Sequence, residues 1–66
     1  MKFSTILKME MEQNHLLQKQ LAEKLGTTQQ TVSRWIKGVN QPDFETLFAI
    51  CKILDLTPNE LLGWDE

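Results

Sequence analysis

Gln30, Arg34 and Lys37 recur at spacings of four and then three residues near the middle of this 66-residue chain. Residues with these spacings lie on one face of an α-helix, and Ser33 and Gln29 flank them there. Gln and Arg side chains form pairs of coplanar hydrogen bonds that match the major-groove edges of adenine and guanine. A solvated helix face would also satisfy the pattern, although Glu and Lys are more usual there. The stripe therefore predicts either a DNA-reading surface or an ordinary exposed face.

Residues 18–37 contain two short helical patterns that meet at a turn with Gly26, and the second pattern carries this stripe. Apolar residues recur at helical spacing in both patterns: Leu21, Ala22 and Leu25 in the first, and Val32, Trp35 and Ile36 in the second. Gly26 suits the end of the first helix, because glycine tolerates a positive φ. Trp35 lies on the same face as Val32, so we expect it in the core and not stacked on a base.

The order of residues from Gln18 resembles the helix-turn-helix of the Cro/repressor (XRE-like) family. The matching positions are Gln18, Leu21-Ala22, Leu25-Gly26, Val32 and Gly38. Thr27-Thr28-Gln29-Gln30 is similar to the start of the recognition helix in lambdoid phage repressors. The resemblance covers about residues 3–63, and it implies that Ala22 and Gly26 are small because the two helices cross closely.

This resemblance implies a sequence-specific binder of double-stranded DNA that acts as a transcriptional regulator, specifically a repressor. Its implied base-reading residues are Thr28, Gln29, Gln30 and Arg34, and its implied DNA-backbone residues are Gln18, Ser33, Lys37 and Asn40. Thr27-x-x-Gln30 also fits a capping box, but the family register makes Thr28 the N-cap of the second helix. Members of the family commonly form homodimers, so the expected target is an imperfect palindrome.

The pattern along the whole chain predicts an all-α fold of five helices in a single domain over residues 1–66. The resemblance implies that this domain is compact and lambda-repressor-like. We expect the first helix over about residues 3–14 with Ser4 as its cap, a positive-φ turn at His15, and a weak cap at Leu17 before the second helix. The fourth helix is expected over about residues 44–55 after Asp43. Its predicted core face comprises Phe44, Leu47, Phe48, Cys51 and Leu54, with Ile50 at its edge.

The fifth helix is expected to begin after the Thr57-Pro58-Asn59-Glu60 capping box and to end near Gly63. The end of the chain, Leu61-Leu62-Gly63-Trp64, could supply a dimer interface. Trp64 could equally fold back onto the core. The sequence leaves both alternatives open.

Composition argues against several functional classes. The chain has one cysteine, one histidine, no tyrosine and no Gly-rich phosphate loop, so we expect no disulfide, metal ion, cofactor or enzymatic activity. No apolar run approaches the roughly 20 residues that span a bilayer, and the N-terminus lacks a signal-peptide core, so no membrane association is expected. We expect a cytoplasmic protein of bacterial or phage origin, associated with the nucleoid.

Charge is distributed unevenly along the chain. Residues 18–41 carry a net charge of +3, whereas residues 42–66 carry −5. This polarity would orient the helix-turn-helix toward phosphate. The acidic C-terminal part also supports an alternative function: an antitoxin or protein-interaction module on the same fold, with weak or no DNA binding, that docks a basic protein partner.

Overall fold

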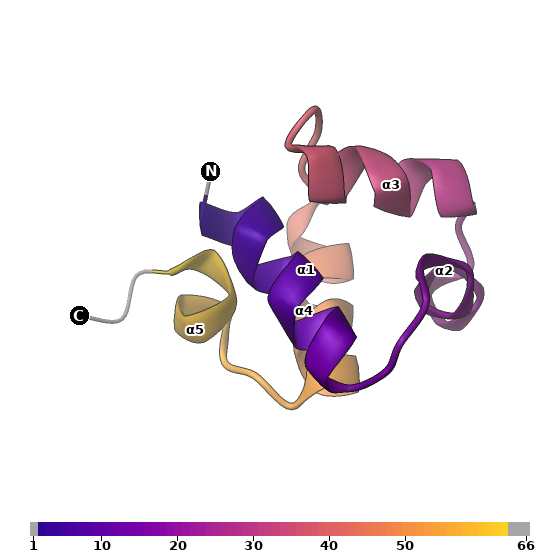
Figure 1. Cartoon of the computed structure of the whole chain (residues 1–66). Coiled ribbons are helices and arrows are strands. Elements are labelled where there is room, and N and C mark those ends of the chain that lie inside the picture. Colours follow the sequence, from indigo (N-terminus) through magenta and orange to yellow (C-terminus); the bar gives the residue numbers. More distant parts are fainter. Residues whose placement is uncertain (1, 64–66) are drawn as a thin grey trace.

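The computed structural model describes residues 2–63, and within them the chain forms five α-helices and no strand (Figure 1). They are α1 (Lys2–Gln13), α2 (Gln18–Leu25), α3 (Gln29–Lys37), α4 (Phe44–Leu54) and α5 (Pro58–Leu62). The predicted all-α fold is therefore confirmed. The end of the chain from Trp64, whose packing was left open, lies outside the described residues.

Side chains at the predicted positions cap three of the helices. Thr28 caps α3, Asp43 caps α4 and Thr57 caps α5, and each accepts a hydrogen bond from the backbone N–H three residues later. In α5 the cap is reciprocal, because Oε1 of Glu60 accepts from the Thr57 N–H at 2.8 Å. His15 has a φ of 53°, as its expected place in a positive-φ turn requires. Local sequence signals thus determine where these three helices begin.

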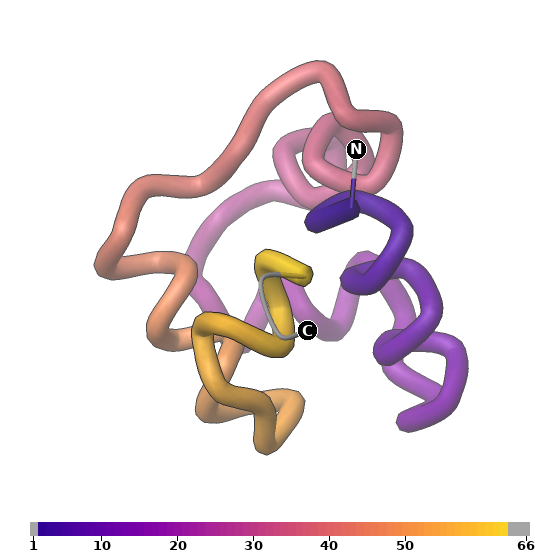
Figure 2. Tube along the Cα trace, turned by 90° about the vertical axis from the view of Figure 1, so that its left-hand side faces the viewer, coloured from indigo at the N-terminus to yellow at the C-terminus, as the bar shows by residue number. Residues whose placement is uncertain are grey.

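α1 lies between α3 and α5 and contacts both of them (Figure 1). α2 and α3 pack closely on each other, and α4 packs against α5 and α2. In Figure 1, α3 lies along one edge of the molecule, and α4 runs away from that edge behind α1. Figure 2 shows the connection between them, residues 38–43, following the outer side of the molecule. One broad side of α3 therefore remains at the surface.

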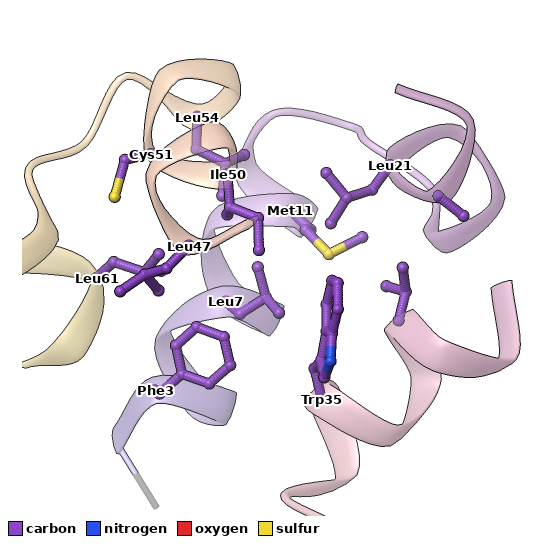
Figure 3. Close-up of a cluster of buried hydrophobic side chains, with 12 residues drawn as sticks. Phe3, Leu7, Met11, Leu21, Trp35, Leu47, Ile50, Cys51, Leu54 and Leu61 are labelled. Carbon is purple, nitrogen blue, oxygen red and sulfur yellow. The ribbon is translucent and has the colours of Figure 1, made fainter. Parts of the chain in front are cut away.

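Every helix contributes to a single hydrophobic core. Its buried members are Phe3, Leu7, Met11, Leu21, Ala22, Val32, Trp35, Leu47, Ile50, Cys51, Leu54 and Leu61. Figure 3 shows the indole of Trp35 pointing from α3 toward Leu7 and Met11 of α1. The prediction that Trp35 belongs to the core is confirmed, since only 5% of the residue is exposed. Leu16, also expected in the core, is half-buried at its margin.

The predicted core face of α4 is wrong at both aromatic residues. Phe44 is 78% exposed and Phe48 is 52% exposed, whereas Ile50, expected at the edge, is fully buried. α4 packs against α5 and α2, and the side of α4 that Ile50 occupies is buried. Since residues in a helix turn by about 100° per position, that side lies away from Phe44 and Phe48.

The sequence predicted that Ser4 caps the first helix. This prediction is wrong, because α1 already begins at Lys2. The Ser4 side chain is instead buried and lies beside the end of α3, where a Cβ added to Gly38 would be 3.6 Å from its Oγ. This contact joins the beginning of α1 to the end of the helix that carries the polar stripe.

Crowding does not explain Gly26, contrary to the expectation from the resemblance. A Cβ added there would have no atom within 4 Å, but the residue has a φ of 73°, which disfavours any side chain. Close approach matters instead at Gly63, where an added Cβ would lie 2.9 Å from Cδ of Lys2. Gly26 is therefore required by backbone conformation alone.

Candidate nucleic-acid interface

Helix α3 separates apolar and polar side chains onto two faces. Val32 is fully buried and Trp35 nearly so, which fixes the rotation of the helix against the core. Gln29, Gln30 and Arg34 are exposed on the remaining surface. Because the buried face leaves α3 only one orientation, the predicted polar stripe is held outward by packing and not by contacts of its own.

Hydrogen bonds between Thr28 and Thr31 define the start of α3. Oγ1 of Thr28 accepts from the Thr31 backbone N–H at 3.2 Å and lies 2.9 Å from Oγ1 of Thr31. The Thr28 hydroxyl is therefore engaged within the helix, although the residue is exposed. Thr31 is a positioning residue that sequence reasoning missed, and its signal was the cap-to-third-residue spacing from Thr28.

The turn between α2 and α3 is closed by the backbone. Thr27 donates its N–H to the carbonyl of Ala22 at 2.9 Å, directly after the left-handed residue Gly26. Thr27 itself is half-buried. Since the turn contains only three residues between helices, its geometry determines how α3 projects from α2.

The start of α2 lacks a polar N-cap side chain, as the sequence predicted for Leu17. Gln20 compensates in part, because its Oε1 accepts the Leu17 backbone N–H at 2.8 Å. Sequence reasoning missed this role of Gln20, whose signal was again the cap-to-third-residue spacing. Gln18 follows directly in the first turn and is half-buried.

A hollow of about 190 Å³ brings the start of α2 beside the C-terminal half of α3. Gln18 and Ile36 both line it, together with Leu17 and residues of α1. Gln18 therefore lies near Ile36, the residue that precedes Lys37 in the sequence. Sequence alone did not show this proximity between two separate helices.

The loop after α3 carries Asn40, which is exposed. Val39 donates its N–H to the Arg34 carbonyl at 2.9 Å, so the chain folds back immediately after the helix ends. Of the eight predicted site residues, only Gln18 and Ser33 are half-buried, and the other six are exposed.

Two titratable groups outside the polar face of α3, Asp43 and Cys51, have shifted pKa values. Hydrogen bonds from Thr46, first through its side chain and then through its backbone N–H, lower the pKa of Asp43. Burial and, secondarily, the charge of Glu60 raise the pKa of the Cys51 thiol, which favours the inert thiol form.

Residues 2–63 contain no group of three or more His, Cys, Asp or Glu side chains that could hold a metal ion. None of the helices in that range is long and apolar enough to cross a membrane.

Comparisons with known proteins agree with this arrangement. A helix-turn-helix family model matches residues 7–61. The HTH-type transcriptional activator BcrR of Enterococcus faecalis is 38% identical over 52 residues, which are 79% of this chain and 26% of the relative. The HTH-type transcriptional regulator YqaE of Bacillus subtilis is 38% identical over 60 residues, which are 91% of this chain and 52% of the relative.

The HTH-type transcriptional regulator DicA of Escherichia coli is 37% identical over 49 residues, covering 74% of this chain and 36% of the relative. The chain therefore spans between about a quarter and a half of the length of these relatives. No solved structure gives a significant match.

Proposed function

The chain belongs to the helix-turn-helix family of the Cro/repressor (XRE-like) type, and we propose that it binds double-stranded DNA in a sequence-specific manner to regulate transcription. The observation that carries the proposal is the uninterrupted polar surface of α3. That surface includes Gln29, Gln30 and Arg34, held outward by the buried Val32 and Trp35. The names of the three relatives describe transcription regulators, which agrees with the proposal.

The dimensions of α3 suit the major groove. An α-helix is about 10–12 Å across, and the groove is about 12 Å wide. The nine residues of α3 rise about 13 Å, which corresponds to roughly four base pairs of duplex. One copy of the chain would therefore read a half-site of about four base pairs.

Base readout is assigned to Thr28, Gln29, Gln30 and Arg34. In this proposal the two Gln side chains pair with adenine edges and Arg34 pairs with guanine. Because the Thr28 hydroxyl already contacts Thr31, the methyl group of Thr28 is the part left to contact a thymine methyl.

Backbone contacts are assigned to Gln18, Ser33, Lys37 and Asn40. Gln18 begins a helix whose N-cap, Leu17, forms no side-chain hydrogen bond, so first-turn backbone N–H groups remain for a phosphate. Lys37 supplies positive charge at the other end of the surface. These contacts position the protein on any sequence and make its affinity sensitive to salt.

The proposed assembly is a homodimer on an imperfect palindrome, with half-sites one helical turn, about 34 Å, apart. We propose repression as the direction of regulation, since a protein bound over a promoter excludes polymerase without further contacts. One relative is named an activator, so a reporter with the site placed over or upstream of the promoter decides the direction. DNA binding would place the chain in the cytoplasm, at the nucleoid of a bacterium or of a phage host.

Selection from a randomised duplex pool at about 100 mM salt tests the proposal. The control is the Gln29→Ala/Gln30→Ala variant, which keeps the core of α3. The expected result is a palindromic sequence enriched by the wild type and lost or changed with the control. If the wild type enriches no sequence, the DNA-binding proposal is wrong.

The second candidate function is an antitoxin or protein-interaction module with weak or no DNA binding. The net charge of −5 on residues 42–66 favours it, because that part would dock a basic partner. Partner affinity should then be unchanged by Gln30→Ala and Arg34→Ala. A DNA-binding antitoxin would combine both functions.

A further inference from the structure

Leu17 occupies a helix start at which a polar side chain would stabilise the protein. The side chains of Thr28, Asp43 and Thr57 each accept a backbone hydrogen bond at the starts of α3, α4 and α5, whereas Leu17 at the start of α2 forms none. Leu17 also gains little from burial, because 64% of the residue is exposed. A residue that benefits neither its helix nor the core is a candidate for contact with a partner.

The Leu17 side chain lines an apolar hollow of about 190 Å³ between α1, the start of α2 and α3, which we call the Leu17 hollow. Its other apolar walls are Met11, which is buried, and Leu16 and Ile36, which are half-buried. A cavity of roughly 150 Å³ with apolar walls is large enough to bind benzene. A deoxyribose ring is no larger than benzene, so the Leu17 hollow has room for one sugar of a DNA strand.

Two polar residues of the Leu17 hollow suit the phosphates on either side of such a sugar. Lys8 of α1 is exposed and positively charged, and Gln18 of α2 is already assigned to a phosphate in the proposed function. Along a DNA strand each deoxyribose lies between two phosphates, so a surface that binds neighbouring phosphates meets the sugar between them. An apolar hollow flanked by a cation and an amide donor is complementary to that order of groups.

We infer that the Leu17 hollow receives a deoxyribose of the DNA backbone, with Leu17 packed against the sugar and Lys8 paired with an adjacent phosphate. The inference rests on the proposed DNA-binding function, and it extends the interface from α3 to α1 and the start of α2. Continuity with that interface favours DNA as the occupant, because Ile36 lines the hollow and directly precedes Lys37, a proposed backbone contact. Leu17 and Lys8 would therefore add affinity on every sequence alike.

Glu12 opposes this occupant. It lines the Leu17 hollow one turn along α1 from Lys8, and its exposed carboxylate would repel a phosphate. Glu12→Gln should therefore tighten DNA binding about two- to threefold. Lys8→Ala should weaken binding to all sequences and lower the salt slope by about one unit. Lys52→Ala removes an exposed lysine of α4 that does not line the hollow, so this matched control should keep the wild-type slope.

The main test measures stability and DNA affinity on the same Leu17 variants. Leu17→Ser supplies the missing N-cap and should raise the urea midpoint of unfolding, yet its affinity for the duplex selected by the wild type should fall about three- to tenfold. Leu17→Ala supplies no cap and should lose the same affinity. Because neither substitution removes a charge, both variants should keep the wild-type salt slope. Opposite changes in the stability and affinity of Leu17→Ser would exclude misfolding as the cause of the loss.

Two further variants serve as controls for this test. Leu17→Met keeps an apolar side chain and should bind DNA like the wild type. Met9→Ala should also do so, because it removes a 48% exposed side chain of α1 that does not line the Leu17 hollow. Wild-type affinity in Leu17→Ala would overturn the inference and leave the proposed function intact. Absence of DNA binding by the wild type would overturn both.

NMR of the complex identifies the DNA group that Leu17 contacts. The protein carries isotopically labelled leucine methyl groups, and nuclear Overhauser effects are recorded between them and the duplex. Effects between the Leu17 methyl groups and deoxyribose protons are expected and would support the inference. Effects to a thymine methyl group would show that Leu17 reads a base, and effects to no DNA proton would show that another molecule or solvent occupies the hollow. Either of these two results would overturn the inference.

Discussion

Arg34 and Trp35 are adjacent in α3, yet Arg34 is exposed and only 5% of Trp35 is exposed. Their substitutions should therefore separate binding from stability. Trp35→Ala should lower the free energy of unfolding by about 3–5 kcal/mol, because it leaves a cavity in the core. Arg34→Ala should change it by less than about 0.5 kcal/mol. Urea unfolding measures both, and comparable losses would contradict the assigned faces.

Gln30 and Lys37 should differ in what they contribute to DNA affinity. Gln30→Ala should cost about 1–3 kcal/mol and relax the preference at one base position. Lys37→Ala should weaken all sequences alike and lower the salt slope by about one unit. Affinities for a panel of single-base variants of the selected site, at several salt concentrations, check both. A changed sequence preference in Lys37→Ala would show that the assigned face is wrong.

Gly26 allows a test of conformation against crowding. Gly26→Ala should destabilise the protein by about 1–2 kcal/mol, because a side chain is disfavoured at its positive φ. Gly26→Asn should cost less, since Asn tolerates the left-handed region better than Ala. If crowding were decisive, the larger Asn would be the worse substitution. Thermal and urea unfolding of the two variants distinguish these explanations.

Phe48 and Ile50 form a matched pair on α4 for testing the observed core. Ile50→Ala should lower the free energy of unfolding by about 2–5 kcal/mol, as expected for a fully buried side chain. Phe48→Ala should cost less than about 1 kcal/mol, although it removes a larger side chain. If urea unfolding shows a larger loss for Phe48→Ala than for Ile50→Ala, the aromatic core face that the sequence predicted would be correct.

Asp43 should make stability depend on acid pH. Its folded pKa is lowered by hydrogen bonds from Thr46, so its contribution is present above the unfolded pKa of about 3.9. That contribution is lost as the pH falls through the folded value. Asp43→Asn keeps a side chain that caps helices well but removes the titration. Urea unfolding from pH 7 to acid should therefore show a shallower pH dependence for the variant, and identical profiles would contradict the assignment.

Local sequence signals predicted much of this structure because they act within a few residues. The caps at Thr28, Asp43 and Thr57 need only a polar side chain and the third backbone N–H beyond it. Gly26 needs only its own backbone dihedrals. The separation of Val32 and Trp35 from Arg34 follows from helical periodicity alone, so the orientation of α3 could be predicted from the sequence.

Tertiary structure decided which side of α4 is covered, because an apolar residue at helical spacing does not indicate where neighbouring helices lie. Ile50 is fully buried, whereas Phe44 and Phe48 of the same helix are exposed. The proximity of Gln18 to Ile36 and the Leu17 hollow that they line also depend on how separate helices pack. Sequence by itself thus determined the helices and the polar face of α3. Packing between helices determined which remaining surfaces are available to a partner.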